Sequence, residues 1–168
     1  MEIFIIDSRK ANSVPQSLLQ KFGYGKYYDK NKEKVHQFSY LMTDRILREF
    51  YKIENCSLTF QNEKPFLETK EKHFSISHSG VYIAIAFSDF NCGINIEETK
   101  PRNYEEISKR MNFESGSLRE FYYNWTKYEA EYKLGEKAGS LYTTEIPKYI
   151  ITAVCVNRDE KFEIYYSI

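Results

Sequence analysis

Short apolar runs, several of them alternating with polar positions, predict the strands of this chain. They cover residues 2–6, 73–77, 81–87, 92–96, 150–156 and 161–166, with a weaker alternation over 56–60. The run 81–87, VYIAIAF, is apolar on both faces, which predicts a central strand. Residues 78–80 separate it from the preceding run, a spacing short enough for a β-hairpin.

Three other stretches follow the spacing of an amphipathic helix. Asn31 can cap the first, whose apolar positions are Val35, Phe38, Met42, Ile46 and Phe50. The second covers roughly residues 103–112. The third begins at Ser117, because the Ser-Leu-Arg-Glu pattern that ends at Glu120 is a capping box, and Gly135 ends it.

The two halves of the chain are predicted to contain similar secondary structure. Each carries a long helix and a few strands, which predicts an α/β (α+β) fold of two similar lobes within one compact unit. The N-terminal lobe would span residues 1–87 and the C-terminal lobe residues 88–168, with the join near 87–93. A length of 168 residues suits one domain, or two small lobes that share a core.

Composition excludes several classes of protein. The chain has 24 Lys and Arg residues against 24 Asp and Glu residues, so no overall field attracts nucleic acid or a membrane surface. The three cysteines lie far apart, which suggests neither a disulfide framework nor a zinc site. The N-terminus lacks the features of a signal peptide, and no apolar run has the length of a membrane span. We therefore expect a reduced, soluble, cytoplasmic protein.

Two polar side chains at the end of the run 92–98 make half of a possible cation site. Asn95 and Glu97 are two residues apart on a strand, so their side chains leave the same face. Oxygen ligands of this kind, completed by phosphate and water, suit Mg²⁺. The alternative is that these groups are simply solvated, as acids at strand ends usually are.

The third helix places a carboxylate and an ammonium along one side. Glu129 and Lys133 are one turn apart, and Trp125 of the apolar stripe lies one turn before them. A surface ion pair is the ordinary interpretation of such a spacing. Because Glu129 lies close to the apolar stripe, however, its carboxylate needs a partner, and a metal ion is one candidate.

Two loops could bind an anion. Ser77 and His78 end a strand beside a turn glycine, where hydroxyl, imidazole and main-chain N–H groups can contact a phosphate. Lys64-Pro65 precedes them, with a lysine that can reach an anion and a proline that stiffens its approach. Taken separately, a histidine in a turn is more often structural, and an isolated Lys-Pro pair has little specificity.

Four segments, in this order, resemble motifs of the phosphopantetheinyl transferases of the surfactin-synthetase-activating type. Residues 62–67 (NEKPFL) resemble G-K-P-x-L, and residues 74–80 (FSISHSG) resemble F-N-I-S-H-S-G. Residues 93–98 (GINIEE) resemble G-I-D-I-E, and residues 125–133 (WTKYEAEYK) resemble W-[ST]-x-K-E-[AS]-x-x-K. The similarity therefore runs from about residue 60 to 135.

This resemblance implies an activity and a fold. Such enzymes transfer the 4′-phosphopantetheine group of coenzyme A to a serine of an apo acyl carrier or peptidyl carrier protein in fatty-acid, polyketide or peptide synthesis. Their two α/β lobes are related by a pseudo-twofold axis, and coenzyme A lies in the cleft between them. We accordingly expect coenzyme A and a carrier protein as partners, and neither nucleic acid nor membrane.

The resemblance also implies roles for individual residues. The coenzyme A contacts would come from Lys64, Pro65, Ser77, His78 and Lys133. Mg²⁺, or Mn²⁺ in its place, would be bound by Asn95, Glu97 and Glu129. The catalytic residues would be Glu129, Glu97 and Lys133, with Lys133 at the pyrophosphate. Glu129, or a water oriented by Glu97, would take the proton of the carrier serine.

Three departures from the family pattern affect these roles. Asn95 stands where the family has Asp, which removes one negative charge from the cation site. Tyr128 stands where Lys is usual, and residues 36–39 lack the arginine that relatives carry for the nucleotide. Two alternatives to an active transferase therefore stay open. One is a degenerate homologue that binds coenzyme A or a carrier protein without efficient catalysis, and the other is a different function on the same fold.

Overall fold

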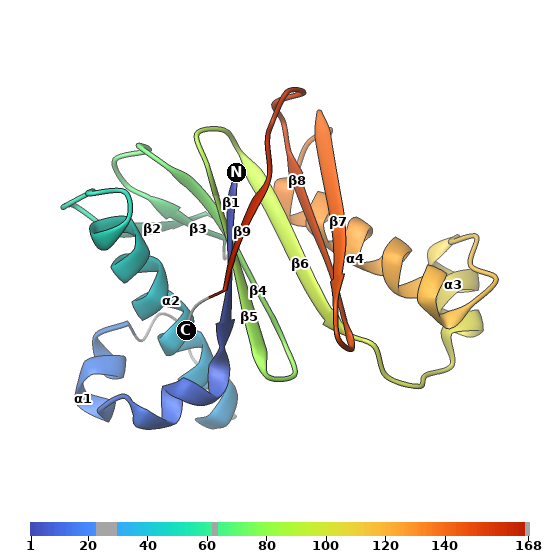
Figure 1. The fold of residues 1–168 in the computed structure, drawn as a ribbon, viewed down its shortest axis with the longest axis horizontal. Helices are drawn as coiled ribbons and strands as arrows, with labels where there is room; N and C mark the ends of the chain where they lie inside the picture. Colours follow the sequence, from blue (N-terminus) through green and yellow to red (C-terminus); the bar gives the residue numbers. More distant parts are fainter. Residues whose placement is uncertain (23–29, 62–63, 167–168) are drawn as a thin grey trace.

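Two β-sheets that pack against each other lie between two long helices (Figure 1). The computed structural model describes residues 1–22, 30–61 and 64–166, with the main chain alone for residues 30–32. The first sheet has the strand order β4-β5-β1-β9 and the second has the order β6-β8-β7. A separate hairpin pairs β2 with β3.

The elements have the following bounds. The first sheet contains β1 (Glu2–Asp7), β4 (His73–Ser79), β5 (Tyr82–Ser88) and β9 (Glu163–Tyr166). The second sheet contains β6 (Cys92–Glu98), β7 (Ser140–Ile146) and β8 (Tyr149–Cys155), and the hairpin contains β2 (Leu58–Gln61) and β3 (Lys64–Leu67). The helices are α1 (Gln16–Leu19), α2 (Lys30–Glu49), α3 (Tyr104–Met111) and α4 (Leu118–Leu134), with 3₁₀ turns at Ser8–Ser13 and Gln20–Phe22.

Strand β5 is apolar on both faces because each face belongs to a different core. Ile83 and Ile85 pack on one side with Phe38 of α2. Ala84 and Ala86 point to the other side and pack against β6 and β8 of the second sheet. Alternate side chains of a strand leave opposite faces. Here the isoleucine side chains on one face are branched, and the alanine side chains on the other are small. The central position expected for residues 81–87 is confirmed, since β5 lies between β4 and β1.

Helix α4 covers the outer face of the second sheet as α2 covers that of the first. Ala130 and Leu134 form a core cluster with Val154 of β8, and the hydroxyl of Thr126 lies 2.9 Å from that of Thr152. The expected mixed α/β fold is therefore confirmed. The expected join near residues 87–93 falls between β5 and β6, and β9 later returns to pair in parallel with β1. A pseudo-twofold relation between the two halves stays a prediction.

Local signals place most elements correctly. Six of the predicted runs overlap β1, β4, β5, β6, β8 and β9, and the weaker run 56–60 overlaps β2. The turn predicted over residues 78–80 is shorter, because β4 continues through His78 and Ser79. At the start of α4 the Ser117 hydroxyl accepts from the N–H of Glu120, while the Glu120 carboxylate accepts from Gly116. Gly135, with a φ of 77°, ends the helix. The cap proposed at Asn31 concerns a side chain outside the described residues.

Two strands are missing from the pattern-based prediction. Strand β7 (Ser140–Ile146) is the edge of the second sheet, and its polar sequence SLYTTEI carries no clear alternation. Strand β3 (Lys64–Leu67) contains a proline and pairs only with the short β2. Both are edge strands, where exposure of one side weakens the hydrophobic signal. No helix within the described ranges is both long and apolar enough to cross a membrane.

Candidate functional site

Strands β4 and β6 belong to different sheets but are joined by a ladder of serine side chains. The hydroxyls of Ser75, Ser77 and Ser79 accept hydrogen bonds from the main-chain N–H groups of Ile94, Ile96 and Glu98, at 3.2, 3.3 and 3.0 Å. Successive N–H groups of a strand point to alternate sides, so these three share the side that faces β4. The serines therefore satisfy donors that a neighbouring strand would otherwise pair. We call this contact the serine seam.

The serine seam also fixes the two polar side chains of β6. The Ser77 hydroxyl donates to Asn95 Oδ1 at 2.7 Å, and the Ser79 hydroxyl donates to Glu97 Oε2 at 3.2 Å. Ser77 is 6% exposed and Asn95 is 4% exposed, so this part of the seam is buried. As the sequence predicts, Asn95 and Glu97 lie on one face of β6, and their orientation comes from β4.

Close packing of α4 on β6 completes the arrangement. A Cβ atom placed on Gly93 would lie 2.1 Å from the carbonyl oxygen of Ala130, so only glycine permits this approach. The contact brings Trp125 of α4 beside Glu97, whose Oε1 accepts from the indole N–H at 3.2 Å. The Glu97 carboxylate therefore receives two neutral donors, one from β4 and one from α4.

The ammonium group of Lys133 lies at the serine seam. It donates to the carbonyl oxygens of Ile76 and Ile94 at 3.3 and 3.0 Å, and to Asn95 Oδ1 at 3.1 Å. Burial lowers the pKa of Lys133 to about 8, while the negative charges of Glu129 and Glu97 act in the opposite direction. Asn95 and Lys133 therefore meet at the serine seam, and the carboxylates of Glu97 and Glu129 lie close enough for their charges to act on the ammonium.

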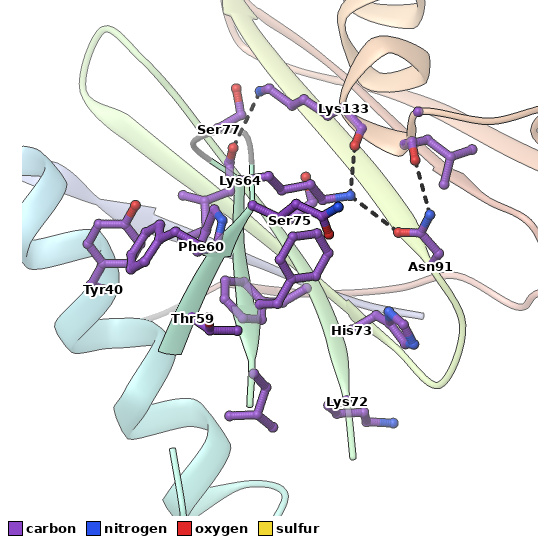
Figure 2. Close-up of a pocket in the computed structure, with 18 of the residues that line it drawn as sticks. Tyr40, Thr59, Phe60, Lys64, Lys72, His73, Ser75, Ser77, Asn91 and Lys133 are labelled. Carbon is purple, nitrogen blue, oxygen red and sulfur yellow. Dashed lines mark hydrogen bonds between the residues drawn. The ribbon is translucent and has the colours of Figure 1, made fainter. Parts of the chain in front are cut away.

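Lys64 approaches the same region from the hairpin. Its ammonium donates to the carbonyl oxygen of Lys133 at 2.7 Å and to Asn91 Oδ1 at 3.2 Å (Figure 2). The Asn91 amide in turn donates to the carbonyl oxygen of Leu134 at 3.0 Å. A cation at the C-terminal end of a helix also interacts favourably with the helix dipole. Burial lowers the pKa of Lys64.

His78 pairs with a histidine of α2. The Nε2 atoms of His78 and His36 lie 3.3 Å apart, and the two rings are T-shaped with centroids 5.1 Å apart. His36 is half-buried and His78 is exposed. Burial, helped by the positive charge that His78 can carry, lowers the pKa of His36 from its ordinary 6.5 to about 4. Above pH 4, therefore, His36 is mostly neutral in the folded protein.

The stability of the protein should fall as the pH decreases from about 6.5 to about 4. In this window the unfolded chain protonates His36 while the folded protein does not, so protons favour unfolding. We expect a loss of roughly 1–3 kcal/mol from this group. Urea denaturation of the wild type and of His36→Gln across this range measures the effect. The variant should lose less stability than the wild type over the window, and parallel curves would contradict the assignment.

A groove of about 1310 Å³ runs between α2, the β2–β3 hairpin, β4 and the C-terminal end of α4. Such a volume suits a ligand of nucleotide size. Figure 2 shows Tyr40 and Phe60 on one side of it and Lys64, Asn91 and Lys133 on the other. Lys70 adds positive charge to the lining, against Glu68 and Glu136, while the Lys72 ammonium is paired with Asp89 at 2.5 Å. The groove therefore favours an anionic ligand with an apolar part.

The structure brings most of the predicted site residues to the lining of this groove. Its lining includes Lys64, Pro65, Ser77, His78, Asn95 and Lys133. Glu97 and Glu129 are not among the lining residues that the structure describes, although their charges act on the Lys133 ammonium. Pattern reasoning missed Asn91, which stands in a turn without a signal. It also missed the seam serines Ser75 and Ser79, which the two-residue spacing in SISHS indicates.

The oxygen-bearing side chains predicted to bind the cation are of the chemical types that a hard divalent cation prefers. Glu97 and Glu129 offer carboxylate oxygens and Asn95 an amide oxygen, which are the ligand types that Mg²⁺ prefers. Within residues 1–22, 30–61 and 64–166, no three His, Cys, Asp or Glu side chains are grouped to hold a metal. A cation site at Glu97 and Glu129 would therefore need a third donor outside these four types, as Asn95 is.

Comparison with known proteins tests the resemblance of the four motifs to the phosphopantetheinyl transferases. The chain is similar to the 4′-phosphopantetheinyl transferase Sfp of Bacillus subtilis (strain 168), with 34% identity over 89 residues. The match covers 48% of this chain and 38% of Sfp, so the chain spans well under half of that protein. No family model matches the chain. The similarity to Sfp supports the resemblance to the phosphopantetheinyl transferase superfamily that the four motifs indicate.

Proposed function

We propose that this protein transfers the 4′-phosphopantetheine group of coenzyme A to a serine of an apo acyl carrier or peptidyl carrier protein. The observation that carries the proposal is the contact between Lys133 and Asn95, within reach of the charges of Glu97 and Glu129, beside a basic groove of nucleotide size. The similarity to Sfp over 89 residues supports it independently. We propose Mg²⁺ dependence as part of the same activity, with Mn²⁺ as a possible substitute.

The groove offers suitable contacts for the adenosine bisphosphate part of coenzyme A. His78 is exposed at its edge, and Lys64 uses two of its three N–H donors on Asn91 and the main chain of Lys133. The third donor of Lys64 can bind a phosphate oxygen. Pro65 fixes the neighbouring main chain in β3, opposite Phe60. Ser77 contributes by holding Asn95 and β6 in place, in addition to the phosphate contact proposed for it.

The reaction moves charge toward the groups that surround Lys133. The serine oxygen of the carrier forms a bond to the β-phosphorus, and the bond to the adenosine 3′,5′-bisphosphate leaving group breaks. Negative charge builds on the pyrophosphate oxygens and the leaving group, where the Lys133 ammonium can stabilise it. Glu129 or Glu97 accepts the serine proton, directly or through a water. When bound by Asn95, Glu97 and Glu129, Mg²⁺ would supply further positive charge at the pyrophosphate.

One observation favours the alternative of binding without efficient catalysis. The Asn95 amide oxygen, which replaces a carboxylate of the family pattern, already accepts from Ser77 and Lys133. A neutral ligand with both acceptor positions in use binds a hard cation weakly. Under this alternative coenzyme A still binds in the groove while transfer is slow or absent.

Mass spectrometry of apo carrier proteins incubated with this protein, coenzyme A and either metal tests the proposal. We expect the mass of at least one carrier to increase by one phosphopantetheine group, and the increase to require coenzyme A. Several carriers from fatty-acid, polyketide and peptide synthesis should be compared. If no carrier is modified with Mg²⁺ or Mn²⁺, the transferase proposal is wrong. Calorimetry with coenzyme A then separates a binding protein, which gives heat, from a protein of other function, which gives none.

A further inference from the structure

The Lys133 ammonium is held by neutral oxygens although two carboxylates lie near it. Its three N–H donors go to the carbonyl oxygens of Ile76 and Ile94 and to Asn95 Oδ1. These acceptors come from β4 and β6, the two strands that the serine seam joins. Glu97 and Glu129 act on the ammonium only through their field. A positive charge belonging to the protein therefore already lies at the proposed cation site.

Asn95 is arranged to receive this ammonium. The amide oxygen has two acceptor positions, which Ser77 and Lys133 fill. The amide nitrogen is buried and has no hydrogen-bond partner within the described part of the chain. The reversed orientation of the amide is unfavourable, because it would place the N–H donors of Asn95 against an ammonium and a hydroxyl donor. The oxygen thus stays toward Lys133, and it has no further position for a metal ion.

Glu97 is engaged in a similar way. Its two carboxylate oxygens accept from the Ser79 hydroxyl and from the indole N–H of Trp125. These donors are neutral, so the negative charge of Glu97 stays available to a nearby cation. Together with Glu129 it gives two negative charges beside one ammonium. The site can therefore attract a second cation, but Asn95 Oδ1 is free for it only when Lys133 moves.

We infer that Lys133 is a built-in cation of this site, and that a divalent metal ion must displace its ammonium from Asn95 before Asn95, Glu97 and Glu129 can bind the metal. The inference rests on the cation-binding residues of the proposed function. It concerns the protein alone, however, so its tests use neither coenzyme A nor a carrier. A failed transfer assay would leave both tests below unaffected. Their failure would leave the transfer of phosphopantetheine itself untouched, but absence of any cation binding would also contradict the proposed Mg²⁺ dependence.

The first test compares metal binding by Lys133→Met and the wild type. Trp125 is the single tryptophan and contacts Glu97, so it should sensitise the luminescence of Tb³⁺, a hard cation that binds oxygen ligands. Competition by Mg²⁺ or Mn²⁺ then gives their affinities. We expect Lys133→Met to bind each cation at least about tenfold more tightly, because a like charge and a competitor for Asn95 are removed.

The matched control is Lys127→Met, which removes the same charge from an exposed position of the same helix. Its affinity for each cation should stay within about twofold of the wild type, since exposed charges are screened. Equal affinities of Lys133→Met and the wild type would overturn the inference. Absence of Tb³⁺ binding by both proteins would overturn it too, because the site would then take no external cation.

The second test uses the wild type, in case Lys133→Met does not fold. Brief reaction with acetic anhydride, followed by peptide mass spectrometry, measures how accessible each lysine amine is. If the metal displaces the ammonium, saturating Mn²⁺ should raise the labelling of Lys133 several-fold and leave that of Lys127 unchanged. Labelling of Lys133 that stays constant or falls on addition of the metal would overturn the inference.

Discussion

Glu129→Gln should lower the rate of phosphopantetheine transfer at least about 100-fold and leave the fold intact. Glutamine preserves the shape of the side chain but removes both the negative charge and the ability to accept a proton. Glu129 lies one turn before Lys133 on α4, and its charge acts on the Lys133 ammonium. The substitution therefore affects the proposed proton acceptor, the proposed metal ligand and the electrostatics of Lys133 together. Carrier modification followed by mass spectrometry measures the rate.

Glu131→Gln is the matched control for this variant. It makes the same change two residues further along the same helix, and a rotation of about 200° directs the two side chains to different sides. Its transfer rate should stay within about threefold of the wild type. Should Glu129→Gln also stay within threefold, Glu129 would be neither the proton acceptor nor an essential metal ligand. Binding of coenzyme A, followed by Trp125 fluorescence, should persist in both variants, so that the loss is one of turnover.

The elements of the core could be predicted from the sequence because burial leaves a strong pattern. Residues 81–87 are apolar throughout since β5 packs on both faces, and the cap at Ser117 is a local signal that needs no tertiary context. The edge strand Ser140–Ile146 was missed for the opposite reason, because one side of it faces solvent. The pairing of β9 with β1 joins the two ends of the chain, and no local pattern encodes such a contact.

The site residues were found largely through their resemblance to motifs, but their contacts were not. Spacing alone placed Asn95 and Glu97 on one face of a strand, which is correct. The sequence gives no sign that Ser77 and Lys133 share the amide oxygen of Asn95, because the three residues come from three different elements. Nor does it show that Lys64 binds the end of α4. Such contacts depend on how α4 and the hairpin are oriented, which is a property of the whole fold.

Gly93 controls how closely α4 approaches β6, and through it the geometry of the site. A Cβ atom at this position would lie 2.1 Å from the carbonyl oxygen of Ala130 and 2.9 Å from the main-chain nitrogen of Leu134. Both are main-chain atoms of α4, so the clash can be relieved only if the helix moves away from the strand. Glu129 and Lys133 would move with it, while Asn95 and Glu97 stay on β6.

Gly93→Ala should therefore reduce both stability and transfer. Overpacking of this kind costs about 3 kcal/mol, which corresponds to a decrease in melting temperature of roughly 6–12 °C for a chain of this length. At a temperature where the variant is still folded, transfer should fall at least about tenfold, because the reacting groups are held further apart. Thermal unfolding and the carrier assay measure the two effects, and the fluorescence of Trp125 reports the displacement of α4 directly.

Gly116→Ala is the comparison for this variant, since both make the same chemical change beside the same helix. A Cβ atom at Gly116 would meet only the flexible carboxylate of Glu120, at 3.2 Å, which can rotate away. Its melting temperature should therefore lie within a few degrees of that of the wild type, and its transfer rate should be close to normal. If Gly93→Ala melts at the same temperature as Gly116→Ala, the close approach of α4 to β6 is not what holds Lys133 against Asn95. The arrangement of the site would then have to depend on the serine seam and Lys64 instead.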